Sequence, residues 1–241
     1  MKKIISVLFF CVITVAIYSQ TAEEYYTQAK ETDYTEKGNA KKAISFLNKA
    51  IESNPNYKEA LVLRAKIYEW QGSYDNEIKD ISTLIKSDSL KPEYYKLRAI
   101  AYALKTEAEK AIDDYTKAYN LDTSMIDCIY ERGMIYYNSY KGKKDQLALA
   151  DFNFCINYAS LNYKSLAYIG RGKLFENQGD LVNAINEYNT AIKINPLCKE
   201  AYLARGILKI SQNQEGCYDL LKYRDLNGPN AQEYLNNYCY K

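Results

Sequence analysis

Apolar residues recur along this chain at the three- and four-residue steps of an α-helix. Ile185, Tyr188, Ala191 and Ile192 form one such series, and this spacing places them on a single helical face. The series does not show the apolar and polar alternation that is typical of a β-strand. The pattern therefore predicts an all-α protein.

The helical pattern is itself repeated along the chain. An arginine is followed by a small residue in five places, and successive arginines are separated by 34, 34, 39 and 34 residues. These pairs are Arg64-Ala65, Arg98-Ala99, Arg132-Gly133, Arg171-Gly172 and Arg205-Gly206. The residues four positions after the arginines are aromatic except in the last copy: Tyr68, Tyr102, Tyr136, Phe175 and Lys209.

A second helix is predicted in each copy. It carries a small residue four positions before an aromatic one, as in Ala111 with Tyr115, Ala148 with Phe152 and Ala184 with Tyr188. The small residue lets two helices approach closely, and the aromatic side chains fill the space beside that contact. Because one helix pair cannot bury its apolar stripe alone, the copies are expected to stack.

The stretch that begins at Ala167 carries a recognisable motif. It contains Gly170-Arg171-Gly172, Gly179-Asp180-Leu181 and Ile194-Asn195-Pro196, and it closely resembles a tetratricopeptide repeat. The resemblance extends over almost all of residues 22–228. It implies a right-handed superhelical solenoid of about six helix-turn-helix hairpins.

The expected hairpins occupy residues 22–56, 57–91, 92–125, 126–162, 163–198 and 199–228. Residues 229–241 are expected to form a C-terminal capping helix. Such a cap is needed because the last repeat would otherwise expose the apolar face that a further repeat would cover.

The first 19 residues are predicted to be a secretory signal peptide. Lys2 and Lys3 precede an apolar run over residues 4–17, and polar residues follow it. This run is shorter than the ~20 residues of a membrane-spanning helix. We expect cleavage between Ser19 and Gln20, and a periplasmic or extracellular location for the mature chain.

Charge and composition argue against several classes of function. Without residues 1–20 the chain has 30 basic and 30 acidic residues, so no basic surface favours nucleic acid. The sequence contains no histidine, which removes the usual general base and the commonest metal ligand. We therefore predict no enzyme activity, no cofactor and no metal site.

Each repeated arginine is matched by an acidic residue in the second helix of its repeat. We expect these pairs to be structural ion pairs between packed helices, because the acids would neutralise a ladder of arginines offered to an acidic ligand. The sequence leaves open whether the pairs are buried or exposed. The pairs are Arg64 with Asp80, Arg98 with Asp114, Arg132 with Asp151, Arg171 with Glu187 and Arg205 with Asp219.

Cysteine usage suggests one disulfide. Of six cysteines, Cys11 lies in the predicted signal peptide, and a lipid anchor there is not expected because Phe9 and Phe10 stand where small residues are needed. Cys217 and Cys239 lie on what should be adjacent closing helices, so they are the best candidate pair. The alternative is that both are small buried apolar residues.

The family resemblance also implies a binding surface. In tetratricopeptide repeats the first helix of each hairpin lines a concave groove, and its outward side touches a peptide or a partner helix. Carried over to this sequence, the groove candidates are Lys66, Glu69, Trp70, Lys96, Tyr130, Tyr137, Lys173 and Asn177. The set of lysines and asparagines that some relatives use to hold a C-terminal carboxylate is not reproduced.

The resulting hypothesis is an adaptor in the cell envelope that binds a protein or peptide partner in this groove. The alternative is a module that binds cell-wall glycans through exposed tyrosine and tryptophan rings, because such rings stack on sugars. The identity of the partner and self-association are left open by the sequence.

Overall fold

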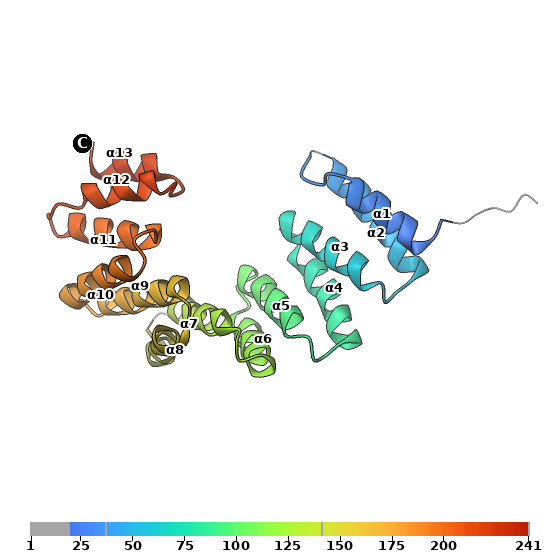
Figure 1. Ribbon diagram of the computed structural model, residues 1–241, viewed down its shortest axis with the longest axis horizontal. Coiled ribbons are helices and arrows are strands. Elements are labelled where there is room, and N and C mark those ends of the chain that lie inside the picture. Colours follow the sequence, from blue (N-terminus) through green and yellow to red (C-terminus); the bar gives the residue numbers. More distant parts are fainter. Residues whose placement is uncertain (1–19, 37, 141, 241) are drawn as a thin grey trace, which may run out of the picture. The chain divides into compact units, whose positions relative to one another are not determined.

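The computed structural model describes residues 20–36, 38–140 and 142–240. In these ranges the chain forms thirteen α-helices and no strand, which confirms the all-α prediction (Figure 1). The predicted signal peptide, including Cys11, lies outside the described residues. No helix among the described residues is long and apolar enough to cross a membrane.

The helices follow one another with short connections. They are α1 (Ala22–Glu31), α2 (Asn39–Ser53), α3 (Lys58–Trp70), α4 (Tyr74–Ser87), α5 (Pro92–Leu104), α6 (Ala108–Leu121), α7 (Ile126–Tyr140), α8 (Asp145–Tyr158), α9 (Leu161–Asn177), α10 (Leu181–Ile194), α11 (Lys199–Ser211), α12 (Cys217–Asp225) and α13 (Ala231–Tyr238).

The chain divides into two compact units, and the division falls within α3, after Arg64. In the first unit α1 packs against α2. The rings of Tyr26 and Tyr57 lie 5.2 Å apart in this unit, and the Tyr57 hydroxyl donates a hydrogen bond to the Glu23 carboxylate. The N-terminus of α1 is held by a capping box in which Thr21 and Glu24 bond each other's backbone N–H groups.

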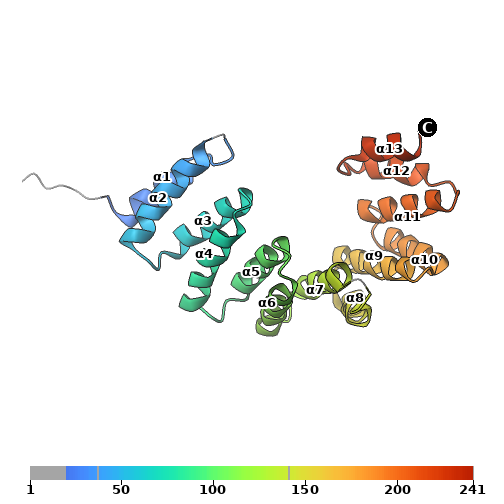
Figure 2. The same ribbon diagram turned by 180° about the vertical axis from the view of Figure 1, so that it is seen from behind.

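In the second unit each helix from α4 to α13 contacts the next one along the chain. In addition, α9 contacts both α7 and α11, which places the first helices of three successive hairpins side by side. Figure 2 shows the same succession of helical hairpins from behind. The hairpins of this unit therefore stack in sequence order, as repeats must when each covers the apolar face of its neighbour.

The repeated small and aromatic residues form the core of each hairpin. Ala184 and Tyr188 of α10 are both completely buried. A Cβ atom added to Gly172 of α9 would lie 2.5 Å from the Tyr188 ring, so the glycine is what allows α9 and α10 to pack this closely. Ala148 and Phe152 of α8 are also completely buried. A Cβ atom added to Gly170 of α9 would lie 2.6 Å from the Phe152 ring, so this glycine likewise allows α8 and α9 to pack closely.

A residue in the left-handed conformation marks the turn inside several hairpins. Gly72 and Gly179 adopt it at φ 69° and 79°, which a residue without a Cβ does at little cost. Thr106 and Asn213 take the same conformation between α5 and α6 and between α11 and α12. The β-branched threonine is the strained member of this set.

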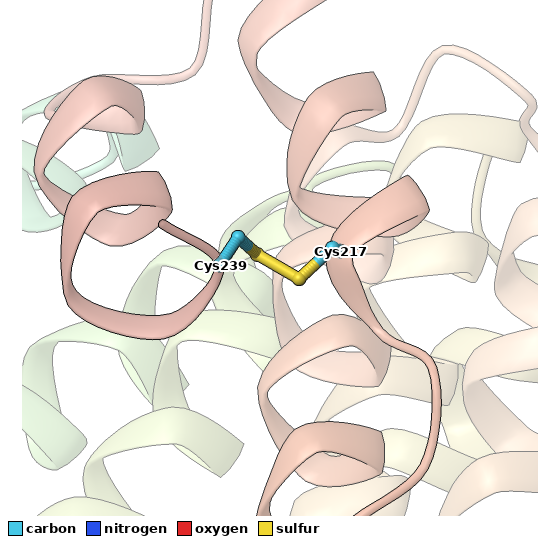
Figure 3. Close-up of a disulfide and its surroundings, with 2 residues drawn as sticks. All are labelled: Cys217 and Cys239. Atoms are coloured by element: carbon cyan, nitrogen blue, oxygen red, sulfur yellow. A yellow bond between two sulfur atoms is a disulfide. The ribbon is translucent and has the colours of Figure 1, made fainter. Parts of the chain in front are cut away.

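The C-terminal helix α13 packs on α12. Leu220 of α12 and Leu235 of α13 are completely buried, and the rings of Tyr223 and Tyr234 meet edge to face at 5.9 Å. A disulfide joins Cys217, at the start of α12, to Cys239, which follows α13 (Figure 3). Apolar packing and a covalent bond thus hold α13 over the end of the array.

Candidate functional site

A groove with two adjoining pockets lies between α5 and α7, and we call it the α5–α7 groove. One pocket, of about 550 Å³, is lined mainly by α7, and the other, of about 430 Å³, lies between α5, α7 and the start of α9. Ala103 of α5, Tyr115 of α6 and Glu131 of α7 line both pockets. The two pockets are therefore parts of one continuous depression.

Apolar side chains form part of both walls of this groove. Ile100 and Leu104 of α5 form one side, and Met134 and Ile135 of α7 form part of the other. Leu104 is about half exposed although it is a leucine. Such walls offer apolar surface that a bound side chain would remove from water.

The groove also carries three charged side chains. Lys96 of α5 forms an ion pair with Asp127 of α7, and both side chains are partly buried. Burial lowers the pKa of Lys96, but its hydrogen bond to Asp127 and the charge of that carboxylate raise it more. The lysine therefore remains charged, and its charge is paired with that of Asp127 on α7.

Glu131 is the third charged group, and its carboxylate makes no hydrogen bond or ion pair within the described part of the chain. Burial raises the pKa of the Glu131 carboxyl, the charge of Asp127 raises it further, and Lys96 partly opposes both. The side chain is partly desolvated and still lines both pockets. It is a hydrogen-bond acceptor in need of a donor.

Aromatic rings continue the groove toward α9. Tyr163 of α9 lines the smaller pocket, and its ring lies 5.6 Å from that of Tyr130 on α7. Tyr130 also packs against Phe152, at 6.1 Å, and burial raises the pKa of its hydroxyl group. Tyr130, a groove candidate from the sequence, is therefore held in the packing between hairpins.

A third pocket lies farther along α7. It has a volume of about 480 Å³ and is lined by Tyr137, Asn138, Gly142, Asp145 and Asn177. Tyr137 and Asn177, two of the predicted groove residues, thus come together here, and burial raises the pKa of the Tyr137 hydroxyl. The buried Oδ1 atom of Asp145 has no hydrogen-bond partner among the described residues.

The remaining groove candidates are distributed along two helices. Lys66, Glu69 and Trp70 belong to α3 and are exposed, Trp70 by 52%. Lys173 belongs to α9 and is partly buried. None of these four lines the α5–α7 groove as the structure describes it.

The repeated arginines lie inside the array and bridge neighbouring hairpins. The Nε and Nη2 atoms of Arg132 donate hydrogen bonds to Asp151 at 2.9 and 2.6 Å, and Nη1 donates to the Thr116 hydroxyl of the preceding hairpin at 2.9 Å. The carboxylate side chain is only 8% exposed, and burial raises the pKa of Asp151 although Arg132 opposes this shift. This two-pronged ion pair is therefore largely desolvated.

The same arrangement recurs in the other hairpins of the second unit. Arg98, Arg171 and Arg205 each donate two hydrogen bonds to Asp114, Glu187 and Asp219, respectively. The third donor of each arginine goes to the preceding hairpin, namely to Ser82, Asn153 and Asn189. In the first unit Arg64 donates to Asn48 at 2.6 Å; its expected partner Asp80 belongs to the second unit.

The polar partners on the preceding hairpin were missed by sequence reasoning, although a signal for them exists. Ser82, Thr116, Asn153 and Asn189 each stand two positions after the acidic residue of their own hairpin. In the last hairpin this position is Leu221, where no arginine of the repeated series follows. A polar residue therefore stands at this position in each hairpin that is followed by a repeat with an arginine to bind.

The other described cysteines lie in the interior as free thiols. Cys128, Cys155 and Cys198 are buried, and burial raises the pKa of Cys128 and Cys155 to about 12. A thiol with such a pKa is a poor nucleophile at neutral pH. Among the described residues, no group of three acidic or cysteine side chains is arranged to hold a metal ion.

Comparisons with known proteins agree with this architecture. A family model of the tetratricopeptide repeat matches residues 34–57 and 166–196. The human mitochondrial import receptor subunit TOM70 is 29% identical over 228 residues, which is 88% of this chain and 36% of the relative. The chain thus spans only about a third of the length of that curated relative.

Two solved structures share the fold. A tetratricopeptide repeat protein from Parabacteroides merdae superposes with a TM-score of 0.66 at 22% identity, over 83% of this chain and 78% of that protein. YrrB, a repeat protein with an unusual peptide-binding site, superposes with a TM-score of 0.50 at 18% identity, over 79% of this chain and 97% of YrrB.

Proposed function

Because this chain is a tetratricopeptide-repeat protein, we propose that it is an interaction scaffold that binds a peptide or protein partner in the α5–α7 groove. Proteins of this family are generally scaffolds for protein interactions, and the match to the family model supports this role. The observation that carries the proposal is the pair of adjoining pockets that share Ala103, Tyr115 and Glu131. Peptide binding by YrrB, a protein of the same fold, supports the proposal.

The dimensions of the groove suit a peptide. Its two pockets have volumes of about 550 and 430 Å³, which is within the range of sites that hold small ligands or individual side chains. The pockets alternate apolar walls with a few polar groups, and this combination allows main-chain hydrogen bonds beside buried side chains. We place the protein outside the cytoplasm, since the Cys217–Cys239 disulfide is of a kind that persists in oxidising compartments.

The test is a photo-crosslinking experiment in the groove. A photoreactive amino acid replaces Ser139, an exposed residue that lines the larger pocket, and the chain is irradiated with an extract of the cells that produce it. We expect a specific protein adduct, and we expect the adduct to disappear when Ala103→Phe fills the groove. The matched control Ala150→Phe makes the same change at an exposed position of α8 and should leave the adduct unchanged. An adduct that survives Ala103→Phe would show that the partner binds elsewhere.

A glycan is the second candidate ligand, because Trp70 is 52% exposed and an exposed indole ring can stack on a sugar. Sedimentation with insoluble cell-wall polysaccharide tests this alternative. Binding that is lost with Trp70→Ala and retained with Ala103→Phe would favour the glycan over the peptide.

A further inference from the structure

The charges of the α5–α7 groove do not balance. Asp127 and Glu131 are both acidic, and Lys96 is the one basic side chain among the described residues that line the two pockets. Lys96 is engaged by Asp127, so Glu131 carries a negative charge that is not paired within the described residues. A partly buried carboxylate without a partner is unfavourable until a cation or a hydrogen-bond donor reaches it.

A second polar group in the same pockets also lacks a partner. Tyr115 of α6 is only 3% exposed, and it lines both pockets. Its hydroxyl makes no hydrogen bond within the described part of the chain. Burial, together with the nearby charge of Glu131, raises the pKa of Tyr115, so the hydroxyl stays neutral and can accept a hydrogen bond.

Several side chains around these two groups are apolar or aromatic. Ile100, Ala103 and Leu104 line the smaller pocket on the α5 side, and the ring of Tyr163 lines it on the α9 side. A ligand group that fits must therefore combine a long apolar stem with a positively charged head that donates several hydrogen bonds. An arginine side chain has these properties, and its planar head can also stack on a tyrosine ring.

We propose that the α5–α7 groove selects a peptide segment with an arginine next to an apolar residue, and that Glu131 and the Tyr115 hydroxyl hold the guanidinium group. The proposal rests on the proposed peptide-binding function and specifies its ligand. The apolar neighbour of the arginine enters the larger pocket beside Met134 and Ile135. An acidic ligand is disfavoured, because it would meet two carboxylates and a lysine that is already paired.

A peptide-display selection against the whole chain tests this proposal. Random peptides are selected on the wild-type protein and on Glu131→Gln, which removes the charge and keeps the shape. The matched control is Asp113→Asn, which makes the same chemical change at an exposed residue of α6. We expect arginine next to an apolar residue to be enriched by the wild type and by the control, and not by Glu131→Gln.

Affinities of defined peptides give the second measurement. Short acetylated and amidated peptides centred on Leu-Arg-Leu, Leu-Lys-Leu, Leu-Gln-Leu or Leu-Glu-Leu are titrated by fluorescence anisotropy. We expect the arginine peptide to bind best and to lose at least about tenfold in affinity on Glu131→Gln, because a charge-assisted hydrogen bond is broken. Tyr115→Phe should also weaken the arginine peptide while thermal unfolding stays unchanged, since the hydroxyl has no partner in the fold.

The outcomes separate the two proposals. Peptides that bind the groove without basic enrichment, or equally well to Glu131→Gln, would overturn the arginine specificity and leave peptide binding intact. If no peptide is selected and the Ser139 crosslinker captures no protein, both proposals are wrong.

Discussion

Glu77 is an acidic residue that the fold buries although its carboxyl group can carry a charge. It is only 3% exposed and is the fourth residue of α4, the position at which α6, α8 and α10 have the completely buried Ala111, Ala148 and Ala184. Its Oε2 atom has no hydrogen-bond partner among the described residues. Burial raises the pKa of Glu77 to about 7, and the charge of Glu69 contributes to this shift.

The raised pKa has a defined effect on stability. The ordinary pKa of a glutamate is 4.5, so the folded chain holds the Glu77 proton more tightly than the unfolded chain does. The stabilisation is complete below the unfolded pKa and is lost as the pH rises through about 7. The shift corresponds to about 3 kcal/mol in total, of which about 2 kcal/mol falls between about pH 5.5 and 8.5.

Urea unfolding at a series of pH values measures this effect. We expect the wild type to lose about 2 kcal/mol more unfolding free energy than Glu77→Gln between about pH 5.5 and 8.5. The absence of histidine removes the residue type that usually titrates here. Glu131→Gln serves as a second variant. Because the pKa of Glu131 is also raised, this substitution should likewise reduce the loss of stability with rising pH.

The control is Glu93→Gln, which changes an exposed glutamate at the start of α5 and should follow the wild-type curve. If Glu77→Gln and the wild type lose stability in parallel as the pH rises, the reasoning about this buried carboxyl is wrong.

Three further predictions concern stability. Arg132→Met leaves a buried carboxylate unpaired and should cost about 3–5 kcal/mol in urea unfolding; a loss below about 1 kcal/mol would mean that the pair behaves as an exposed one. Gly172→Ala forces a Cβ atom against the Tyr188 ring and should lower the unfolding free energy by about 1–3 kcal/mol. Thermal unfolding measures this loss. An unchanged unfolding midpoint would show that α9 and α10 can move apart freely. Replacing both Cys217 and Cys239 by serine opens a loop with a sequence separation of 22 and should lower stability by about 3 kcal/mol in the chain-entropy model. The amide hydrogens of α12 and α13 should also exchange faster with solvent. Unchanged exchange would show that the disulfide does not brace these two helices.

The all-α fold could be predicted because the chemistry of the repeated segments is local and periodic. The small residue after each arginine and the aromatic residue of the second helix recur at fixed steps, and close helix packing requires both. Gly172 under Tyr188 is the physical reason for that pattern. The all-α fold and the resemblance to tetratricopeptide repeats followed from these residues alone.

The candidate site was predicted less well, because its residues do not repeat. Tyr137 and Asn177 were expected in a groove and do come together in a pocket. Glu131 and Tyr115, the central groups of the α5–α7 groove, carry no sequence signal that separates them from ordinary surface and core residues. Lys96 looked like a ligand-binding cation until the structure paired it with Asp127 on the neighbouring hairpin.

The sequence by itself determined which residues of each hairpin face inward, since a helical face is specified by spacing within one segment. Only the tertiary structure decided which charges meet between hairpins, because that depends on the rotation of one hairpin against the next. Such contacts include Arg132 with Thr116 and Lys96 with Asp127. The tertiary structure also decided that Glu77 is buried with no hydrogen-bond partner for its Oε2 atom among the described residues, because only neighbouring helices can remove a side chain from water.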